Sequence, residues 1–391
     1  MSWNYVRLGD VCSKIGSGAT PKGGATVYID SEISLIRSQN VYNLEFSYDG
    51  LAHITEDAAE KLNGVTVLKN DVLLNITGDS VARTCIVPES VLPARVNQHV
   101  AIVRPNQEEV NSLFLNYYLA SPYMQSFMLG LAVGKGASRN AMTKDMIANF
   151  EVPCPPIDIQ ESIVSILSAY DNLIENNQKQ IKLLEEAAQR VYKEWFIDLR
   201  FPGYEYTVIV DGVPEGWKKV GLASIAPIVT GKKDANFGTA DGKYLFFTCA
   251  QEPIKAPSYS FDCDAVILAG NGDFNVKLYR GQFEAYQRTY VFSPYDKDHL
   301  YLLYHAVRES MRQLFQGASG STIKFLTKHM LEDILVHIPE DSILQAYNSN
   351  CEAIQKKIEC LKNQIISSQE ARDRLLPKLM SGEIEVQEVL V

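Results

Sequence analysis

The longest regular pattern of apolar positions lies between residues 159 and 198, a stretch that contains neither Gly nor Pro. Its apolar positions recur in gaps that alternate between four and three residues. This heptad pattern predicts a long helix that buries one stripe against another helix, and about forty residues of helix measure roughly 60 Å. The positions of the stripe, the seam of the helix, are Ile163, Leu167, Tyr170, Ile174, Asn177, Ile181, Leu184, Ala188, Val191 and Trp195.

The same pattern returns later in the sequence at a constant offset, which relates Ile163 to Tyr347, so the partner helix is predicted within the same chain. Eight of its ten positions suit a seam, and at the other two, Ser368 and Arg372, packing is expected to loosen or to admit another chain. The same offset relates Pro155 to Pro339, which precede the helices. One offset covering both regions disfavours two unrelated helices and predicts a duplicated unit, a globular part followed by a long helix. The second seam is Tyr347, Cys351, Ile354, Ile358, Leu361, Ile365, Ser368, Arg372, Leu375 and Leu379.

Both globular parts contain short runs rich in β-branched residues and bounded by turn residues, which predict strands. The predicted fold class is α+β, with two mixed globular domains linked by two long helices that form an antiparallel coiled coil with a pseudo-two-fold repeat. The expected boundaries are 1–156 for the first domain, 157–200 for the first helix, 201–340 for the second domain, and 341–391 for the second helix and C-terminal tail. Strands are expected at 33–37, 65–68, 72–76, 84–87, 100–103, 244–248, 265–269, 276–279 and 289–292, and short helices at 113–119 and 122–129.

The formal net charge of −10 argues against a simple electrostatic attachment to nucleic acid, because such proteins usually carry a basic excess. Binding to DNA would therefore need local basic patches or positive charge from a partner. No apolar run is long enough to span a bilayer, and the first residues do not resemble a signal peptide. A cytoplasmic location with reduced thiols is the expectation.

Sequence motifs for catalysis and metal binding are absent from the chain. The seven cysteines and six histidines show no zinc-binding spacing, so no metal site is expected. The loop at 134–140 contains Gly134-Lys135 but lacks the other residues of a nucleotide-binding P-loop. No Pro-Asp dipeptide begins a nuclease site, and the Pro155-Pro156 segment lacks the residues of an amino-methyltransferase site. The prediction is a protein with no catalytic residues and no cofactor of its own.

Polar loops supply the candidates for DNA contact, since Arg, Lys, Asn and Gln are the side chains that read base edges and phosphates. The glycine-rich stretch 16–24 is interpreted either as a flexible loop or as a backbone cradle for phosphate. Each candidate is also compatible with an ordinary surface position. The candidates are Lys22, Arg37, Gln39, Arg83, Gln98, Lys135, Ser138 and Arg139 in the first domain, and Lys232, Lys233, Lys277, Arg288 and Lys324 in the second.

Several segments resemble the conserved regions of one protein family. They are LLEEAAQRVYKEWFIDLRFPGYE at 183–205, RDRLLPKLMSGEIEV at 372–386, PEGW at 214–217 and FEVPCPP at 150–156. Together with the duplicated plan, these segments resemble the specificity subunits of type I restriction–modification systems. Asn97-Gln98, Gly78, Gly272 and the run 281–286 are similar to recurrent positions of that family, with a structural role equally open. Gln160-Glu161 reverses the family's usual order of these two residues.

The resemblance implies a subunit without catalysis that reads a bipartite target in double-stranded DNA, one half-site with each globular domain. It also implies docking of two methyltransferase subunits and, through them, of restriction subunits. S-adenosylmethionine would then be bound by the methyltransferase and not by this chain. The alternative is a coiled-coil scaffold whose two globular domains bind protein or carbohydrate partners.

Overall fold

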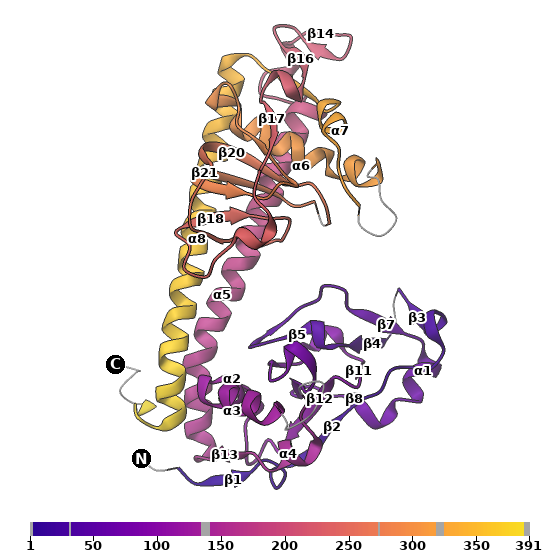
Figure 1. Ribbon diagram of the computed structural model, residues 1–391, viewed down its shortest axis with the longest axis vertical. Coiled ribbons are helices and arrows are strands. Elements are labelled where there is room, and N and C mark those ends of the chain that lie inside the picture. Colours follow the sequence, from indigo (N-terminus) through magenta and orange to yellow (C-terminus); the bar gives the residue numbers. More distant parts are fainter. Residues whose placement is uncertain (1–2, 31–32, 134–140, 273, 318–323, 387–391) are drawn as a thin grey trace. The chain divides into compact units, whose positions relative to one another are not determined.

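The computed structural model describes residues 3–30, 33–133, 141–272, 274–317 and 324–386 (Figure 1). The chain divides into two compact units. Unit 1 comprises residues 1–176 and 364–391, and unit 2 comprises residues 177–363. Each unit therefore contains one globular domain together with half of each long helix.

The long helices are α5 (Ile157–Tyr192) and α8 (Asp341–Ser381), close to the ranges that the heptad pattern predicts. A π-helical turn, Lys193–Ile197, extends α5. The start of α5 is fixed by Gln160, which is fully buried and donates to the carbonyl oxygens of Glu109 and Pro155 at 2.9 and 2.8 Å. Gly382, with φ of 71°, ends α8 in the left-handed conformation typical of a helix C-terminus.

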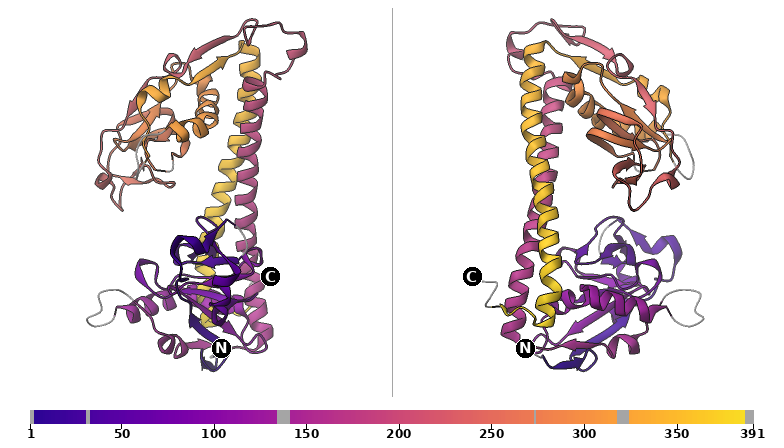
Figure 2. Two further views of the ribbon diagram at one scale, coloured as in Figure 1. Left: turned by 90° about the vertical axis from the view of Figure 1, so that its right-hand side faces the viewer. Right: turned by 60° about the vertical axis from the view of Figure 1, so that its left-hand side comes forward.

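The helices pair antiparallel inside each unit, and Figure 2 shows them side by side. In unit 1, Ile163 and Leu167 from the beginning of α5 share a core with Leu376 and Leu379 from the end of α8. In unit 2, the end of α5 meets the beginning of α8, where Phe196 packs edge-to-face on Tyr347. The predicted antiparallel arrangement is therefore confirmed in both units.

All twenty seam positions are buried or half-buried. The expectation that packing loosens at Ser368 and Arg372 is wrong. Ser368 is 7% exposed, and the Arg372 guanidinium forms an ion pair with Asp171 on α5, at 2.6 Å between Nη1 and Oδ1. A polar residue fits this seam because the facing helix supplies a carboxylate, which also accepts a hydrogen bond from the Tyr117 hydroxyl.

The Arg372–Asp171 pair is expected to stabilise unit 1. Replacing Arg372 with Ala leaves a partly buried carboxylate without its charge-assisted hydrogen bond, so the free energy of unfolding should fall by about 2 kcal/mol. Chemical denaturation followed by fluorescence measures this change. The matched control is Lys69→Ala, which removes an exposed pair with Glu89 and should cost less than about 1 kcal/mol. Equal effects of the two substitutions would contradict the assignment.

The domain of unit 1 contains a four-stranded antiparallel sheet in the order β10-β9-β12-β2 and a five-stranded sheet in the order β3-β7-β4-β11-β8. The four-stranded sheet consists of β2 (Cys12–Ser17), β9 (Val72–Asn75), β10 (Thr84–Ile86) and β12 (Val100–Pro105). The five-stranded sheet consists of β3 (Tyr28–Ile29), β4 (Ile33–Ile36), β7 (Ala52–Ile54), β8 (Thr66–Val67) and β11 (Ala94–Val96). Other elements are the pairs β1 (Tyr5–Arg7) with β13 (Glu151–Pro153) and β5 (Val41–Tyr42) with β6 (Glu45–Phe46), and the helices α1 (Glu56–Glu60), α2 (Ser112–Ala120), α3 (Pro122–Ala132) and α4 (Lys144–Ala148).

The domain of unit 2 is built on one six-stranded sheet in the order β17-β22-β20-β21-β18-β19. Its strands are β17 (Ile228–Thr230), β18 (Tyr244–Phe247), β19 (Ile254–Ala256), β20 (Phe261–Ala269), β21 (Val276–Ala285) and β22 (Thr289–Phe292). The helices are α6 (Leu300–Gly317) and α7 (Lys328–Glu332), and the sequence analysis predicts neither of them. Short pairs join β14 (Ile209–Val210) with β15 (Val213–Pro214) and β16 (Lys218–Gly221) with β23 (Leu335–Ile338).

The duplication extends to the sheets. Strands β10-β9-β12-β2 of unit 1 and β21-β20-β22-β17 of unit 2 have the same order, and every neighbouring pair is antiparallel. Two tyrosines related by the offset of the long helices also make equivalent hydrogen bonds. Tyr117 donates to Asp171, and Tyr301 donates to Glu352 at 2.6 Å, so each domain is joined to the long helix that follows it.

His305 on α6 lies in the core of unit 2, 3% exposed, with Nδ1 2.8 Å from the Tyr347 hydroxyl. Burial and the nearby Arg308 charge lower the pKa of His305 to about 3, well below the value of about 6.5 expected in the unfolded chain. Between these two values the unfolded state binds more protons than the folded state. Lowering the pH therefore favours unfolding.

We expect unit 2 to lose up to about 2 kcal/mol of stability between pH 7 and pH 5 because of this histidine. Denaturation curves of the intact chain at several pH values measure the loss, with His305→Asn as the comparison. The variant is expected to show a shallower dependence on pH. The same slope in both proteins would show that His305 does not titrate in this way.

Candidate nucleic-acid interface

Polar turns gather at one end of the shared four-stranded sheet in each unit. In unit 1 the backbone N–H of Ile76, after β9, donates to the carbonyl of His99, before β12, at 3.0 Å. In unit 2 the N–H of Gly270, after β20, donates to the carbonyl of Arg288, before β22, at 2.8 Å. We call these ends the polar edges. They comprise residues 18–22, 76–80, 97–99 and 141–142 in unit 1, and residues 231–234, 270–272, 286–288 and 324–326 in unit 2.

Matching backbone details show that the two polar edges are equivalent. A Cβ on Gly18 would lie 1.7 Å from the Val96 carbonyl oxygen, and a Cβ on Gly231 would lie 1.9 Å from that of Ala285. Only glycine allows the loop to pass the neighbouring strand this closely. The glycine-rich stretch is thus partly strand β2 and partly this crossing. Gly78 and Gly272 occupy the same turn, with φ of 74° and 73°.

In unit 1 a chain of hydrogen bonds joins three loops of the polar edge. The Thr20 hydroxyl donates to Gln98 Oε1 at 2.5 Å, and Gln98 Nε2 lies 3.0 Å from His99 Nε2. Because an amide nitrogen can only donate, His99 Nε2 accepts and His99 Nδ1 carries the proton. Nδ1 then donates to the Thr77 hydroxyl at 2.5 Å. This chain holds Gln98 in one orientation.

A cavity of about 590 Å³ opens beside this chain of hydrogen bonds. Arg83 lines it, with its guanidinium 4.7 Å from the centre of the Tyr42 ring. Seven of the ten residues that line it have polar or charged side chains, which suit contacts to base edges and phosphates. The polar residues of the wall are Ser38, Gln39, Thr77, Asp79, Ser80, Arg83 and His99.

In unit 2 the polar edge carries more positive charge. Gln287 Nε2 donates to Asp234 Oδ1 at 2.7 Å, and this hydrogen bond holds the Gln287 side chain in one orientation. Arg288 is exposed. Lys233 Nζ lies 4.4 Å from the centre of the Phe237 ring, and Lys324 Nζ lies 3.9 Å from that of Phe315. Lys324 Nζ also donates to the Phe315 carbonyl at 3.1 Å. The aromatic faces therefore hold both ammonium groups in place while they keep their positive charge.

The structure places most of the predicted DNA-contact residues on the polar edges or at the neighbouring cavity. Lys22, Gln98, Lys232, Lys233, Arg288 and Lys324 lie on the polar edges, and Gln39 and Arg83 line the neighbouring cavity. Arg37 lies beside Gln39, and both side chains donate to the Gly50 carbonyl. Lys135, Ser138 and Arg139 lie outside the described residues.

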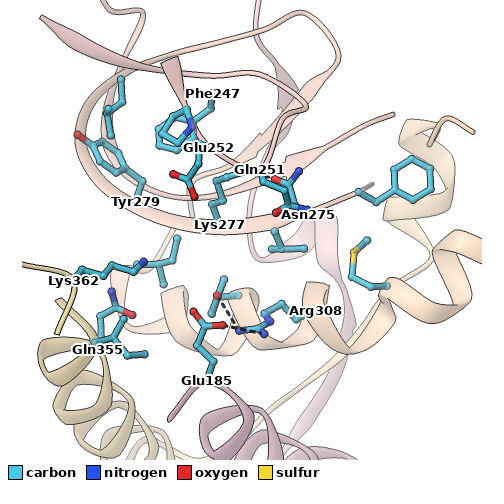
Figure 3. A pocket seen from close by; sticks show the side chains of 18 of the residues that line it. Glu185, Phe247, Gln251, Glu252, Asn275, Lys277, Tyr279, Arg308, Gln355 and Lys362 are labelled. Atoms are coloured by element: carbon cyan, nitrogen blue, oxygen red, sulfur yellow. Dashed lines mark hydrogen bonds and ion pairs between the residues drawn. The ribbon is translucent and has the colours of Figure 1, made fainter. Parts of the chain in front are cut away.

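Lys277 does not belong to the polar edge of unit 2. It lines a separate cavity of about 910 Å³ between the sheet, α6 and the long helices. Figure 3 shows Lys277 beside Glu252 and Asn275, with Arg308 and Glu185 across the cavity. Lys277 Nζ donates to the Ala250 carbonyl at 3.0 Å, and burial lowers the pKa of this lysine. These observations favour a structural role over contact with DNA.

Sequence reasoning missed the residues that hold the candidates in place, namely Thr20, Thr77, His99, Asp234 and Gln287. A signal was available for two of them. Gln98-His99 comes directly before strand β12, and Gln287-Arg288 comes directly before strand β22. Two glutamines in the same place before corresponding strands indicate equivalent positions of a duplicated domain.

The described residues contain no group of three or more His, Cys, Asp or Glu side chains able to hold a metal ion. Within the same ranges, every helix is too short or too polar to cross a bilayer. The polar edge therefore remains the candidate functional site in each unit.

Comparisons with known proteins agree with this plan. The profile of the family described as "Type I restriction modification DNA specificity domain" matches residues 1–186 and 214–366, one match for each copy of the duplicated unit. The specificity subunit of the type I restriction enzyme MjaIX from Methanocaldococcus jannaschii is 24% identical over 99% of this chain and 94% of its own length. The EcoDI specificity subunit from Escherichia coli is 38% identical over 43% of this chain and 36% of its own length.

A solved structure shows the same fold. The crystal structure of a type I restriction–modification S subunit from M. genitalium superimposes with a TM-score of 0.55 at 13% identity, over 97% of this chain and 96% of that chain. Its likeness extends over both domains and both long helices. From the two family matches, which cover most of the sequence, the chain belongs to the type I restriction–modification DNA specificity family.

Proposed function

We propose that this chain is the specificity subunit of a type I restriction–modification complex and that it binds double-stranded DNA with a bipartite target. The observation that carries this function is the duplicated polar edge. Each domain has its own copy of the four-stranded sheet, and both copies end in equivalent turns that carry different side chains at corresponding positions. Such a pair suits two half-sites of different sequence, each read by one domain.

Charge supports the same function locally. The polar edge of unit 2 carries Lys232, Lys233, Arg288 and Lys324 against one carboxylate, Asp234, although the whole chain has a net charge of −10. Lysine and arginine near phosphates provide most of the affinity of a protein for DNA. A partner with basic surface would supply the remaining attraction that an acidic chain lacks.

The partners that we propose are two methyltransferase subunits, which bind the specificity subunit directly, and restriction subunits, which bind through the methyltransferases. S-adenosylmethionine belongs to the methyltransferase in this scheme. The chain itself is proposed to have no catalytic activity. The absence of nuclease, P-loop and methyltransferase motifs from the sequence supports this division of labour.

The purified chain alone is expected neither to methylate nor to cut DNA. Together with its methyltransferase partner and S-adenosylmethionine, it is expected to direct methylation to two short half-sites separated by a fixed gap. Incorporation of labelled methyl groups into random-sequence duplexes, with and without the partner, measures both outcomes. Methyl transfer by the chain without any partner would contradict its non-catalytic role.

A gel-shift experiment with the same duplexes distinguishes DNA recognition from a scaffold function. Retardation of DNA in the presence of the methyltransferase is the expected result. A chain that fails to bind DNA both alone and with the methyltransferase would be a scaffold for protein or carbohydrate partners.

A further inference from the structure

The two polar edges correspond residue by residue at one place, directly before strands β12 and β22. The carbonyl of His99 accepts from Ile76 in unit 1, and the carbonyl of Arg288 accepts from Gly270 in unit 2. The glycine crossings place Val96 and Ala285 in register, three residues before His99 and Arg288 respectively. Residues 98–99 and 287–288 are therefore the same positions of the duplicated domain.

These positions combine a fixed backbone with accessible side chains. Val96, Asn97 and Val100 are buried around Gln98, and Ala285 and Thr289 are buried around Gln287-Arg288, whereas Gln98, Gln287 and Arg288 are exposed. A side chain on a rigid strand end is positioned more accurately than one on a free loop. Direct reading of a base edge needs this accuracy because its hydrogen bonds are short and directional.

We propose that residues 98–99 and 287–288 are equivalent specificity-determining positions, each reading a base pair at the corresponding place of its own half-site. The inference rests on the proposed function and assigns the chemistry of one contact in each domain. Because positions 99 and 288 carry different residues, the two domains recognise different bases at corresponding places of their half-sites.

In unit 2 the reader is Arg288. Among the residues that the structure describes, none hydrogen-bonds to its guanidinium or pairs with it, so its donors remain available for DNA. A guanidinium matches O6 and N7 of guanine with two parallel hydrogen bonds. Gln287 beside it is held by Asp234 through one N–H, so its carbonyl oxygen and second N–H stay available. The second half-site is accordingly assigned a guanine that depends on Arg288.

In unit 1 no cation stands at this place. The His99 ring is occupied on both nitrogens, by Gln98 and by Thr77, in the neutral form that this chain of hydrogen bonds requires. Gln98, oriented by Thr20 and His99, presents its remaining N–H and the second lone pair of its oxygen. The corresponding base pair of the first half-site is therefore read through an amide and not through a guanidinium.

The test exchanges the two positions in the full chain, assembled with its methyltransferase. Arg288→His should reduce discrimination for guanine at one position of the second half-site by about 5- to 150-fold and leave the first half-site unchanged. His99→Arg should alter one position of the first half-site and leave the second unchanged. Sequencing of methylated sites selected from a random library gives base preference at every position of both half-sites. Lys69→Ala, an exposed residue of unit 1 outside the polar edge, is the matched control.

A conservative variant separates base reading from attraction to phosphate. Arg288→Lys keeps the charge but loses the planar fork of the guanidinium. Base reading predicts loss of the guanine preference with total methylation largely retained, and this variant preserves the exposed cation if Arg288→His folds poorly. Uniform loss at all sequences, or unchanged motifs in all variants, would overturn the inference. If the unaltered complex shows no bipartite motif, the proposed function itself fails, which is a distinguishable result.

Discussion

Inserting seven residues into each long helix is expected to widen the gap between the half-sites by about three base pairs while both half-sites keep their sequences. The insertions belong between Asn176 and Asn177 in α5 and between Asn363 and Gln364 in α8, where both helices pass from one unit to the other. Seven residues add about 10 Å of helix, and base pairs are about 3.4 Å apart along DNA. A heptad also preserves the seam.

The two insertions have to be made together. The first half of α5 packs on the last half of α8 in unit 1, and the opposite halves pack in unit 2. An insertion in α5 alone would shift its seam against α8 in one of the units. Two residues inserted at each site are the control, because they rotate the seam by about 200° and should destabilise the protein. Sequencing of methylated sites reads the gap, and an unchanged gap in a folded, active heptad variant would show that the helices do not set it.

Residues 1–200 alone are expected to form a homodimer that directs methylation to a palindrome made of the first half-site twice. The constant offset between the two seams explains why. In such a dimer, residues 180–197 of one copy would take the place that residues 364–381 occupy in unit 1. The core residues Leu376 and Leu379 would be replaced by Tyr192 and Trp195, which are also apolar. An antiparallel pair of identical helices closes with two-fold symmetry, so no further copies are added.

The structure also identifies the weak point of that dimer. Position 188 would take the place of Arg372, so Asp171 would lose the guanidinium that it binds at 2.6 Å. Replacing Ala188 with Arg in the fragment should restore the ion pair at both symmetry-related places of the dimer. The dissociation constant should fall by roughly a hundredfold, since each charge-assisted hydrogen bond contributes about 1.5 kcal/mol. Ala188→Gln, of similar length but without charge, is the control.

Sedimentation of the fragment across a dilution series measures its mass and its dissociation constant. Methylation directed by the fragment and its partner then shows the target. A folded monomer at all concentrations, or a fragment that still directs methylation to the asymmetric target, would show that the two long helices are not interchangeable.

The long helices could be predicted from the sequence because their signal is repeated. Ten seam positions at heptad spacing identify α5, and the same spacing, displaced by a constant offset, identifies α8. Each of the nine runs predicted as strands overlaps an observed strand, since runs such as 72–76 and 100–103 are rich in β-branched residues and bounded by turns. Shorter strands, such as β3 and β7, were not predicted. Helix α6 was not predicted, although its buried residues Leu303, Val307 and Leu314 recur at helical spacing. Unlike the long helices, α6 has no second copy of its apolar pattern identified elsewhere in the sequence.

The candidate site was less predictable because strand pairing assembles it. Strand β12 joins β2 although the two strands are far apart in the sequence, as in the pair Ala101 and Ser17. No local pattern reveals that Thr20 and Gln98 meet. The charge of Lys277 suggests contact with DNA, but the fold places this lysine in a cavity, where it donates to the Ala250 carbonyl and burial lowers its pKa. The packing of Arg372 is unpredictable for a related reason, because its partner in the seam, Asp171, lies 201 positions away in the sequence.

The most direct measurement of the central claim is the set of methylated sites in DNA modified by this chain with its methyltransferase partner. Two equivalent domains predict one bipartite motif with two different half-sites and a fixed gap. Exchange of the second domain, residues 201–340, for that of another family member should replace the second half-site and leave the first unchanged. A contiguous motif, or a motif in which both halves change after that exchange, would contradict the assignment of one half-site to each domain.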